Sequence, residues 1–130
     1  MEKKVTICGK EYNLKTSAYC ILEYKRVFGN GLMADINSMS AISTKIQKIR
    51  EDGEKDKKTE EEIQNEINRV ALEQIDNLVQ IPLQIAYIFI KSSNPKFITF
   101  DEWTMSIENI SVEDEWIAEV TELAVNSFHR

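Results

Sequence analysis

The strongest constraint on this chain is a segment of helix-compatible residues that is apolar on nearly every side. Leu83 to Ile90 carries no charged side chain, and Pro82 comes directly before it. A helix that is apolar all round must be covered by other elements, so we expect this segment to be the most buried helix. The apolar stretch from Ile81 to Ile90 is shorter than the about 20 residues that span a bilayer. We therefore expect no membrane partner.

The first fifteen residues predict a β-hairpin. Apolar and polar residues alternate on both sides of Gly9-Lys10, and glycine at the first central position suits a type II′ turn. A two-residue loop at this place would pair Ile7 with Tyr12 and Val5 with Leu14, which puts all four apolar side chains on one face. Because an isolated hairpin is marginally stable in water, we expect this face to lie on helices.

Apolar residues at three- and four-residue steps predict helices in the next part of the chain. Thr16 or Ser17 caps a first helix that runs to about Phe28 and stops at the following Gly-Asn-Gly. One face of this helix holds Ala18, Ile21, Leu22 and Lys25, with Tyr19, Tyr24 and Phe28 beside it. The apolar stripe from Leu32 to Ile49 predicts a second helix. We expect it to be weak or interrupted, because its middle is rich in Ser, Thr and Asn.

The segment from Arg50 to Glu62 has 11 charged residues among 13 and no apolar side chain. It predicts either a solvated loop, with residues 50–59 as its charged part, or a frayed helix end. An arm that becomes ordered on binding a partner is the functional alternative. Thr59 and Glu62 form a capping box, so a long helix is expected to begin at about Glu60 and to kink at Pro82.

The C-terminal part predicts two further helices. Thr99 and Glu102 form a second capping box, which opens a short helix from about Phe100 to Glu108. The last helix is expected from about Val112 to Ser127. Its predicted buried stripe comprises Trp116 or Ile117, Val120, Leu123, Ala124 and Phe128.

These patterns together predict a single domain over residues 1–130. Its fold class is expected to be α+β and mostly helical, with the hairpin of residues 1–15 packed on a bundle of about four or five helices in residues 16–130. A length of 130 residues suits one hydrophobic core.

The charge distribution argues against nucleic acid as a partner. Residues 1–100 contain 15 Lys/Arg and 14 Asp/Glu, a net charge of +1, whereas residues 101–130 contain 8 acidic residues and one base, a net charge of −7. Nucleic-acid binding normally requires a basic patch, and no such cluster is visible in the sequence. An anionic membrane surface is an unlikely partner for the same reason.

The sequence offers few residues for catalysis or metal binding. Cys8 and Cys20 do not form a CxxC motif, and the single histidine, His129, lies next to the end. A structural zinc site needs about four such ligands. Gly29-Asn30-Gly31 lacks the spacing of a phosphate-binding loop. We expect no catalytic residue, cofactor or metal, and therefore a protein that is not an enzyme. With no signal peptide at the N-terminus, we also expect reduced thiols and a cytoplasmic location.

A dense apolar cluster near a turn is our candidate for a partner-binding surface. It comprises Phe97, Ile98, Phe100 and Trp103. Tryptophan is enriched where proteins meet. The alternative is that Trp103 and Trp116 both anchor the C-terminal helices to the core.

The opening sequence VTICGKEYNLKTSAYCILEYKRVFG resembles the tail assembly chaperones of long-tailed phages and prophages of Gram-positive bacteria. Gly9, Lys10, Glu11, Tyr12 and Leu14 carry most of the likeness. Members are similar in beginning with a short hairpin, followed by a helix with an aromatic-rich face and then by several acidic helices. The N-terminal quarter of the chain carries the match, and the rest agrees in size and general character.

This resemblance implies a function without catalysis. Such chaperones bind the long, aggregation-prone tape-measure protein and help the major tail protein assemble around it. They act in the cytoplasm of the bacterial host and are not expected in the mature virion. A homo-oligomer is also expected if the apolar stripe from Leu32 to Ile49 exceeds what one small chain can cover. The alternatives are a structural head–tail connector or tail-completion component, and a small regulatory adaptor that binds a host protein.

Overall fold

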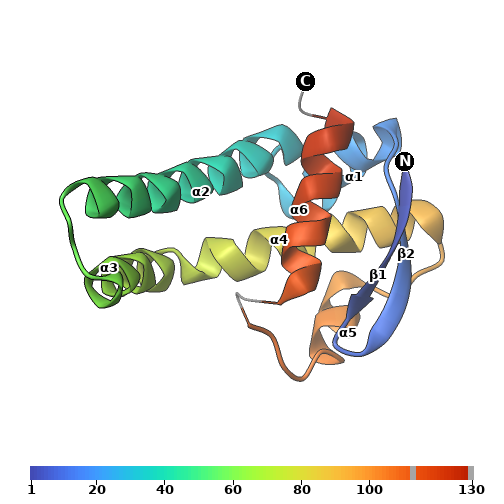
Figure 1. Ribbon diagram of the computed structural model, residues 1–130. Coiled ribbons are helices and arrows are strands. Elements are labelled where there is room, and N and C mark those ends of the chain that lie inside the picture. The colour runs from blue at the N-terminus through green and yellow to red at the C-terminus, as the bar shows by residue number, and fades with distance from the viewer. Residues whose placement is uncertain (112–113, 129–130) are drawn as a thin grey trace.

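The computed structural model describes residues 1–111 and 114–128 (Figure 1). Most of this part is helical, and its one sheet has two antiparallel strands, so the predicted α+β class is confirmed. The elements are, in order, β1 (Glu2–Ile7), β2 (Lys10–Lys15), α1 (Ala18–Phe28), α2 (Leu32–Lys55), α3 (Glu60–Glu73), α4 (Ile75–Ser93), α5 (Phe100–Met105) and α6 (Glu115–Phe128). No helix in these residues is both long and apolar enough to cross a bilayer.

The second half of α4 forms the centre of the molecule. From Ile81 to Ile90 every residue except Leu83 is buried. The strand β2 and the helices α1, α2, α3 and α6 all pack against α4. Figure 1 shows α2 running beside α4 and α6 crossing it. The prediction that the other elements pack around this apolar segment is therefore confirmed.

The hairpin forms as predicted, but its register differs from the expected one by two residues. Val5 pairs with Tyr12, and Ile7 pairs with Lys10. The turn is therefore Cys8-Gly9, whose φ angles of 51° and 79° are both positive, as a type I′ turn requires. Because side chains alternate with a period of two, a shift by two leaves the apolar face unchanged. That face is buried, with β2 on α4 and β1 on α6.

The helix α2 is longer and more regular than expected. It runs without interruption from Leu32 to Lys55, so the predicted interruption is wrong and the charged loop of residues 50–59 shrinks to 56–59. The apolar stripe of α2 packs on α3, α4 and α6. Tertiary packing of this kind outweighs the weak helix propensity of Ser, Thr and Asn. Of the two interpretations of the charged segment, the helix end is the correct one for its first part.

The helical region after residue 59 is broken earlier than predicted. The break between α3 and α4 lies at Gln74, and α4 continues through Pro82. The described chain therefore has six helices rather than about four or five. Pro82 is buried with its apolar neighbours, and their packing holds the helix together despite the missing backbone donor.

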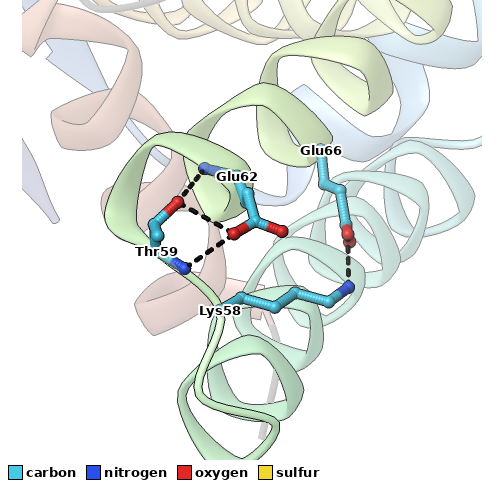
Figure 2. Close-up of polar contacts among 4 residues, drawn as sticks. All are labelled: Lys58, Thr59, Glu62 and Glu66. Carbon is cyan, nitrogen blue, oxygen red and sulfur yellow. Dashed lines mark hydrogen bonds and ion pairs between the residues drawn. The ribbon is translucent and has the colours of Figure 1, made fainter.

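Short-range polar contacts fix the turn between α2 and α3 (Figure 2). The Thr59 hydroxyl accepts a hydrogen bond from the Glu62 backbone N–H at 3.1 Å, and the Glu62 carboxylate accepts one from the Thr59 backbone N–H at 3.2 Å. The predicted capping box is thus confirmed. Lys58 forms an ion pair with Glu66 on the next turn of α3. These contacts allow the chain to reverse direction within four residues that contribute nothing to the core.

The two C-terminal helices agree closely with the sequence. The predicted capping box at Thr99 opens α5, which ends at Met105, somewhat before the expected residue 108. The helix α6 begins at Glu115, and the predicted start at Val112 lies outside the described residues. Its predicted stripe is buried at Trp116, Ile117, Val120, Leu123 and Ala124, whereas Phe128 is half-buried.

The helix α1 buries a charged residue beside its core-facing apolar side chains. Cys20, Glu23 and Tyr24 are its buried residues, and the Glu23 side chain is among the few charged groups buried in the described part of the molecule. Ile21 and Leu22 instead point to solvent. An amphipathic helix normally buries its apolar face, so a specific set of contacts must hold α1 in this orientation.

Glu23 is the centre of those contacts. Its carboxylate lies 2.9 Å from the Lys91 Nζ of α4 and 2.9 Å from the Arg26 guanidinium, and it accepts a hydrogen bond of 2.6 Å from the Tyr19 hydroxyl. The hydrogen bond from Tyr19 and then the one from Lys91 lower the pKa of Glu23 below its ordinary value of 4.5. Burial and the hydrogen bond to Glu23 raise the pKa of Tyr19 to about 12. The carboxylate is therefore ionised and fully engaged at neutral pH.

Gly53 is predicted to be required where α2 meets α3. A Cβ at this position would lie 2.5 Å from the Ile63 Cγ1. Gly53→Ala should therefore lower the free energy of unfolding by about 1–3 kcal/mol through overpacking, although alanine is the better helix former by about 1 kcal/mol. Urea denaturation measures the change. In an Ile63→Ala background the same substitution should be neutral or stabilising; a loss of equal size in both backgrounds would contradict the close approach.

The ion pairs of Glu23 predict a pH-dependent contribution to stability. Glu23→Gln should lower the free energy of unfolding by about 1–3 kcal/mol at neutral pH, because it removes hydrogen bonds to charged groups. The folded-state pKa of Glu23 lies below 4.5. The stabilisation is thus fully present above the unfolded-state pKa and is lost as the pH falls through the folded-state pKa. Denaturation of both proteins across this range should show the gap closing in acid. A gap independent of pH would count against the ionised contact.

Candidate interaction surface

A groove between α4 and α5 is the main apolar hollow that exposes residues of the central helix. Ile75, Val79 and Leu83 line it from α4 at four-residue spacing, and Phe100 lines it from α5. Residues four apart lie on the same face of a helix, so the groove follows the α4 axis. Asp76, Gln80 and Thr104 complete its lining, and its volume is about 550 Å³.

Two smaller hollows extend this groove at its ends. One, of about 310 Å³, shares Ile75 with it and is also lined by Leu72 of α3. The other, of about 370 Å³, shares Phe100 and is also lined by Val27 of α1. We call the three together the α4–α5 groove. Leu72 is 69% exposed and Ile75 is 44% exposed, so one end of the groove is apolar surface open to solvent.

The charges that line the groove are all negative. Asp76 lies beside its centre and Asp101 beside the end near α1, and no Lys or Arg is among the lining residues. The floor is made by side chains from Ile75 to Leu83 and by Phe100. An apolar floor with acidic edges suits an apolar polypeptide segment better than an anionic ligand.

An aromatic cluster holds α5 in place behind the groove. Trp103 contacts Tyr12 of the hairpin edge-to-face, with ring centroids 6.0 Å apart. Phe100 contacts Phe28 of α1 at 4.9 Å and Tyr87 of α4 at 5.4 Å. Such edge-to-face pairs are the favoured geometry of aromatic side chains. The position of Phe100 at the groove therefore depends on contacts with α1 and α4, and that of α5 also on the contact between Trp103 and the hairpin.

The structure brings three of the four residues of the predicted cluster together, since the Trp103 ring lies 6.4 Å from that of Phe97 and 6.3 Å from that of Phe100, but the four differ in burial. Trp103 is 1% exposed, and its indole N–H has no hydrogen-bond partner in the described chain. Phe97 and Phe100 are half-buried, and Ile98 is 43% exposed. Of the four, only Phe100 lines the groove. Trp103, like Trp116, anchors its helix to the core, which was the alternative interpretation of both tryptophans.

Most residues of the groove were not identified from the sequence. Leu72, Ile75, Val79 and Leu83 follow one another at three- and four-residue steps, next to the residues that form the core-facing stripe. This second row makes the apolar band on α3 and α4 wider than a single contact face requires. The width was visible in the sequence. Which part of the band stays uncovered depends on where α5 and α1 pack.

A second hollow, of about 640 Å³, lies between α2 and α6. Met39, Leu78 and Ile117 contribute to its floor, and Glu115 and Glu122 are exposed on the α6 side. The acidic C-terminal part of the chain therefore places its charge on the outer surface of α6. Such charge keeps a protein with exposed apolar surface soluble.

The remaining ionisable groups show no arrangement typical of catalysis. The hydroxyl of buried Tyr24 lies within hydrogen-bonding distance of the Asp35 carboxylate and, at 3.0 Å, of the Gln84 side chain, and burial raises its pKa. Within residues 1–111 and 114–128, no group of three or more His, Cys, Asp and Glu side chains is placed to hold a metal ion. His129 lies outside the described residues. The described polar groups in the core thus serve to fix helices to one another.

Comparison of the chain with models of known protein families, with curated proteins and with solved structures gave no match. The function is therefore inferred from the surfaces described above and from the N-terminal resemblance.

Two substitutions separate structural from surface roles in the predicted cluster. Phe100→Ala should lower the free energy of unfolding by about 2–4 kcal/mol, because it removes a ring packed on α1 and α4. Ile98→Ala should cost less than about 1 kcal/mol, since its side chain is partly exposed. Thermal and urea denaturation measure both. If Ile98→Ala proved the more damaging of the two, the packing of α5 would have to be revised.

Proposed function

We propose that this protein is a tail assembly chaperone of a long-tailed phage or prophage, without enzymatic activity. It binds an apolar helical segment of the tape-measure protein in the α4–α5 groove and keeps that protein soluble while the major tail protein assembles around it. The observation that carries this proposal is the groove itself. It consists of three adjoining hollows that share Ile75 and Phe100 and include Leu72, with only carboxylates among their charged lining residues.

Two further observations support the proposal. The hairpin residues Gly9 to Leu14 resemble the same region of such chaperones. The acidic surface of α6 supplies the net charge that a protein with exposed apolar patches needs to remain soluble. On this proposal the protein acts in the bacterial cytoplasm and leaves before the virion is complete.

The proposal predicts that the groove binds the tape-measure protein. The tagged chain is co-expressed with the tape-measure and major tail proteins encoded by its neighbouring genes, and the captured proteins are identified by mass spectrometry. The double variant Leu72→Asp/Ile75→Asp should capture about tenfold less tape-measure protein than the wild type, because burying two unpaired charges costs more than 1.4 kcal/mol. Both substituted residues are exposed, so the circular dichroism of the variant should be unchanged.

Met105→Asp is the matched control, because Met105 of α5 is 85% exposed and lines no part of the groove, whereas Leu72 is 69% exposed. It should capture as much tape-measure protein as the wild type. Capture of mature particle proteins instead, or of a single host protein, would reject the chaperone in favour of the connector or the adaptor. Normal capture by the double variant would keep the chaperone but exclude the groove as its client site.

A further inference from the structure

The outer face of α1 is apolar surface that no other element of the described chain covers. Ile21 and Leu22 are exposed by 41% and 65%, and Tyr19 beside them by 37%. Ile21 and Leu22 lie with Ala18 and Lys25 at the spacing of a single helical face. The opposite face, which carries Cys20 and Tyr24, is the one that packs on the core.

Contacts on the core-facing side of α1 fix the orientation of this outer face. Glu23 is held by Lys91 of α4, and the Tyr24 hydroxyl is held by Gln84 of the same helix. Rotating α1 to bury Leu22 would expose Tyr24 and break both sets of contacts. It would also leave Lys91 without its partner. The apolar face is thus presented outward as a rigid surface, which lowers the entropic cost of binding.

The exposed charges on this face are positive, although the chain as a whole has a net charge of −6. Lys25 and Arg26 occupy the last turn of α1, and the helix has no acidic residue in its first turn. Its one acidic residue, Glu23, is buried. A partner that complements this surface must therefore combine apolar side chains with carboxylates.

We propose that the outer face of α1 binds an amphipathic helix of a partner protein whose apolar stripe is flanked by Asp and Glu. The two helices would pack side by side, with Ile21 and Leu22 against the partner's apolar stripe and Lys25 against its carboxylates. The 11 residues of α1 match a contact of about three helical turns. Ile21 and Leu22 line no part of the α4–α5 groove.

A protein helix fits this surface better than a membrane. A basic amphipathic face can also lie on anionic lipid, but stable attachment needs a larger apolar area or several free cations. Arg26 is engaged by Glu23, which leaves Lys25 as the unpaired cation of α1 in the described structure. The net charge of −6 opposes approach to an anionic bilayer. The inference stands independently of the client proposed for the groove.

Two synthetic helical peptides of about four turns test the proposal by fluorescence anisotropy with the full chain. Both carry leucines at every third and fourth position; one has glutamates and the other lysines at the flanking positions. The glutamate peptide should bind about tenfold more tightly than the lysine peptide. Leu22→Asp should weaken its binding about tenfold or more, and Lys25→Glu should remove the preference between the peptides. Met105→Asp, at a residue that is 85% exposed and belongs to neither surface, should change neither result.

Three results would overturn the proposal. The first is that the chain binds the two peptides equally well, or that the Leu22→Asp variant binds the glutamate peptide as tightly as the wild type does. The second is binding to vesicles of anionic phospholipid that Leu22→Asp abolishes, which would make the face a membrane surface. The third is sedimentation of the wild type as an oligomer that Leu22→Asp converts to a monomer, which would make the face a contact between copies of this chain.

Discussion

The fold depends on covering one helix, because α4 is apolar on nearly every side from Ile81 to Ile90. A strand and four helices pack around it, and each approaches from a different direction. The helix α1 contributes Cys20 and Tyr24 to this core, and polar contacts fix its orientation, with Glu23 meeting Lys91 and Tyr24 meeting Gln84. The surfaces available to partners follow from this arrangement.

Features set by local physics were the ones that the sequence predicted well. The capping box of Thr59 and Glu62 and the apolar stripe of α6 depend on residues close in the chain, and both were found as expected. The hairpin was predicted with the correct buried face but the wrong turn. The alternation of apolar and polar residues determines which face is buried, but it is equally compatible with two strand registers that differ by two residues. The continuity of α2 and the break at Gln74 depend on tertiary packing that local propensity does not encode.

The candidate surface was harder to predict for a related reason. Hydrophobicity identified Trp103 and Phe100 as a cluster, but not which of the two would be buried. The groove lies where α5 and α1 stop covering α4, and the exposed face of α1 results from a buried ion pair between residues far apart in the chain. Exposed apolar surface therefore occurs in two places, one with acidic edges and one with basic residues.

The helix α1 turns Cys20, Glu23 and Tyr24 inward and Ile21 and Leu22 outward. The rates at which thiols on these two faces react with a maleimide test this orientation. Cys20 is fully buried and Leu22 is 65% exposed, so they are compared in the variants Cys8→Ser and Cys8→Ser/Cys20→Ser/Leu22→Cys. The thiol introduced by Leu22→Cys should react at least about a hundredfold faster, because Cys20 reacts only after local opening. Equal rates, or faster reaction of Cys20, would contradict this orientation.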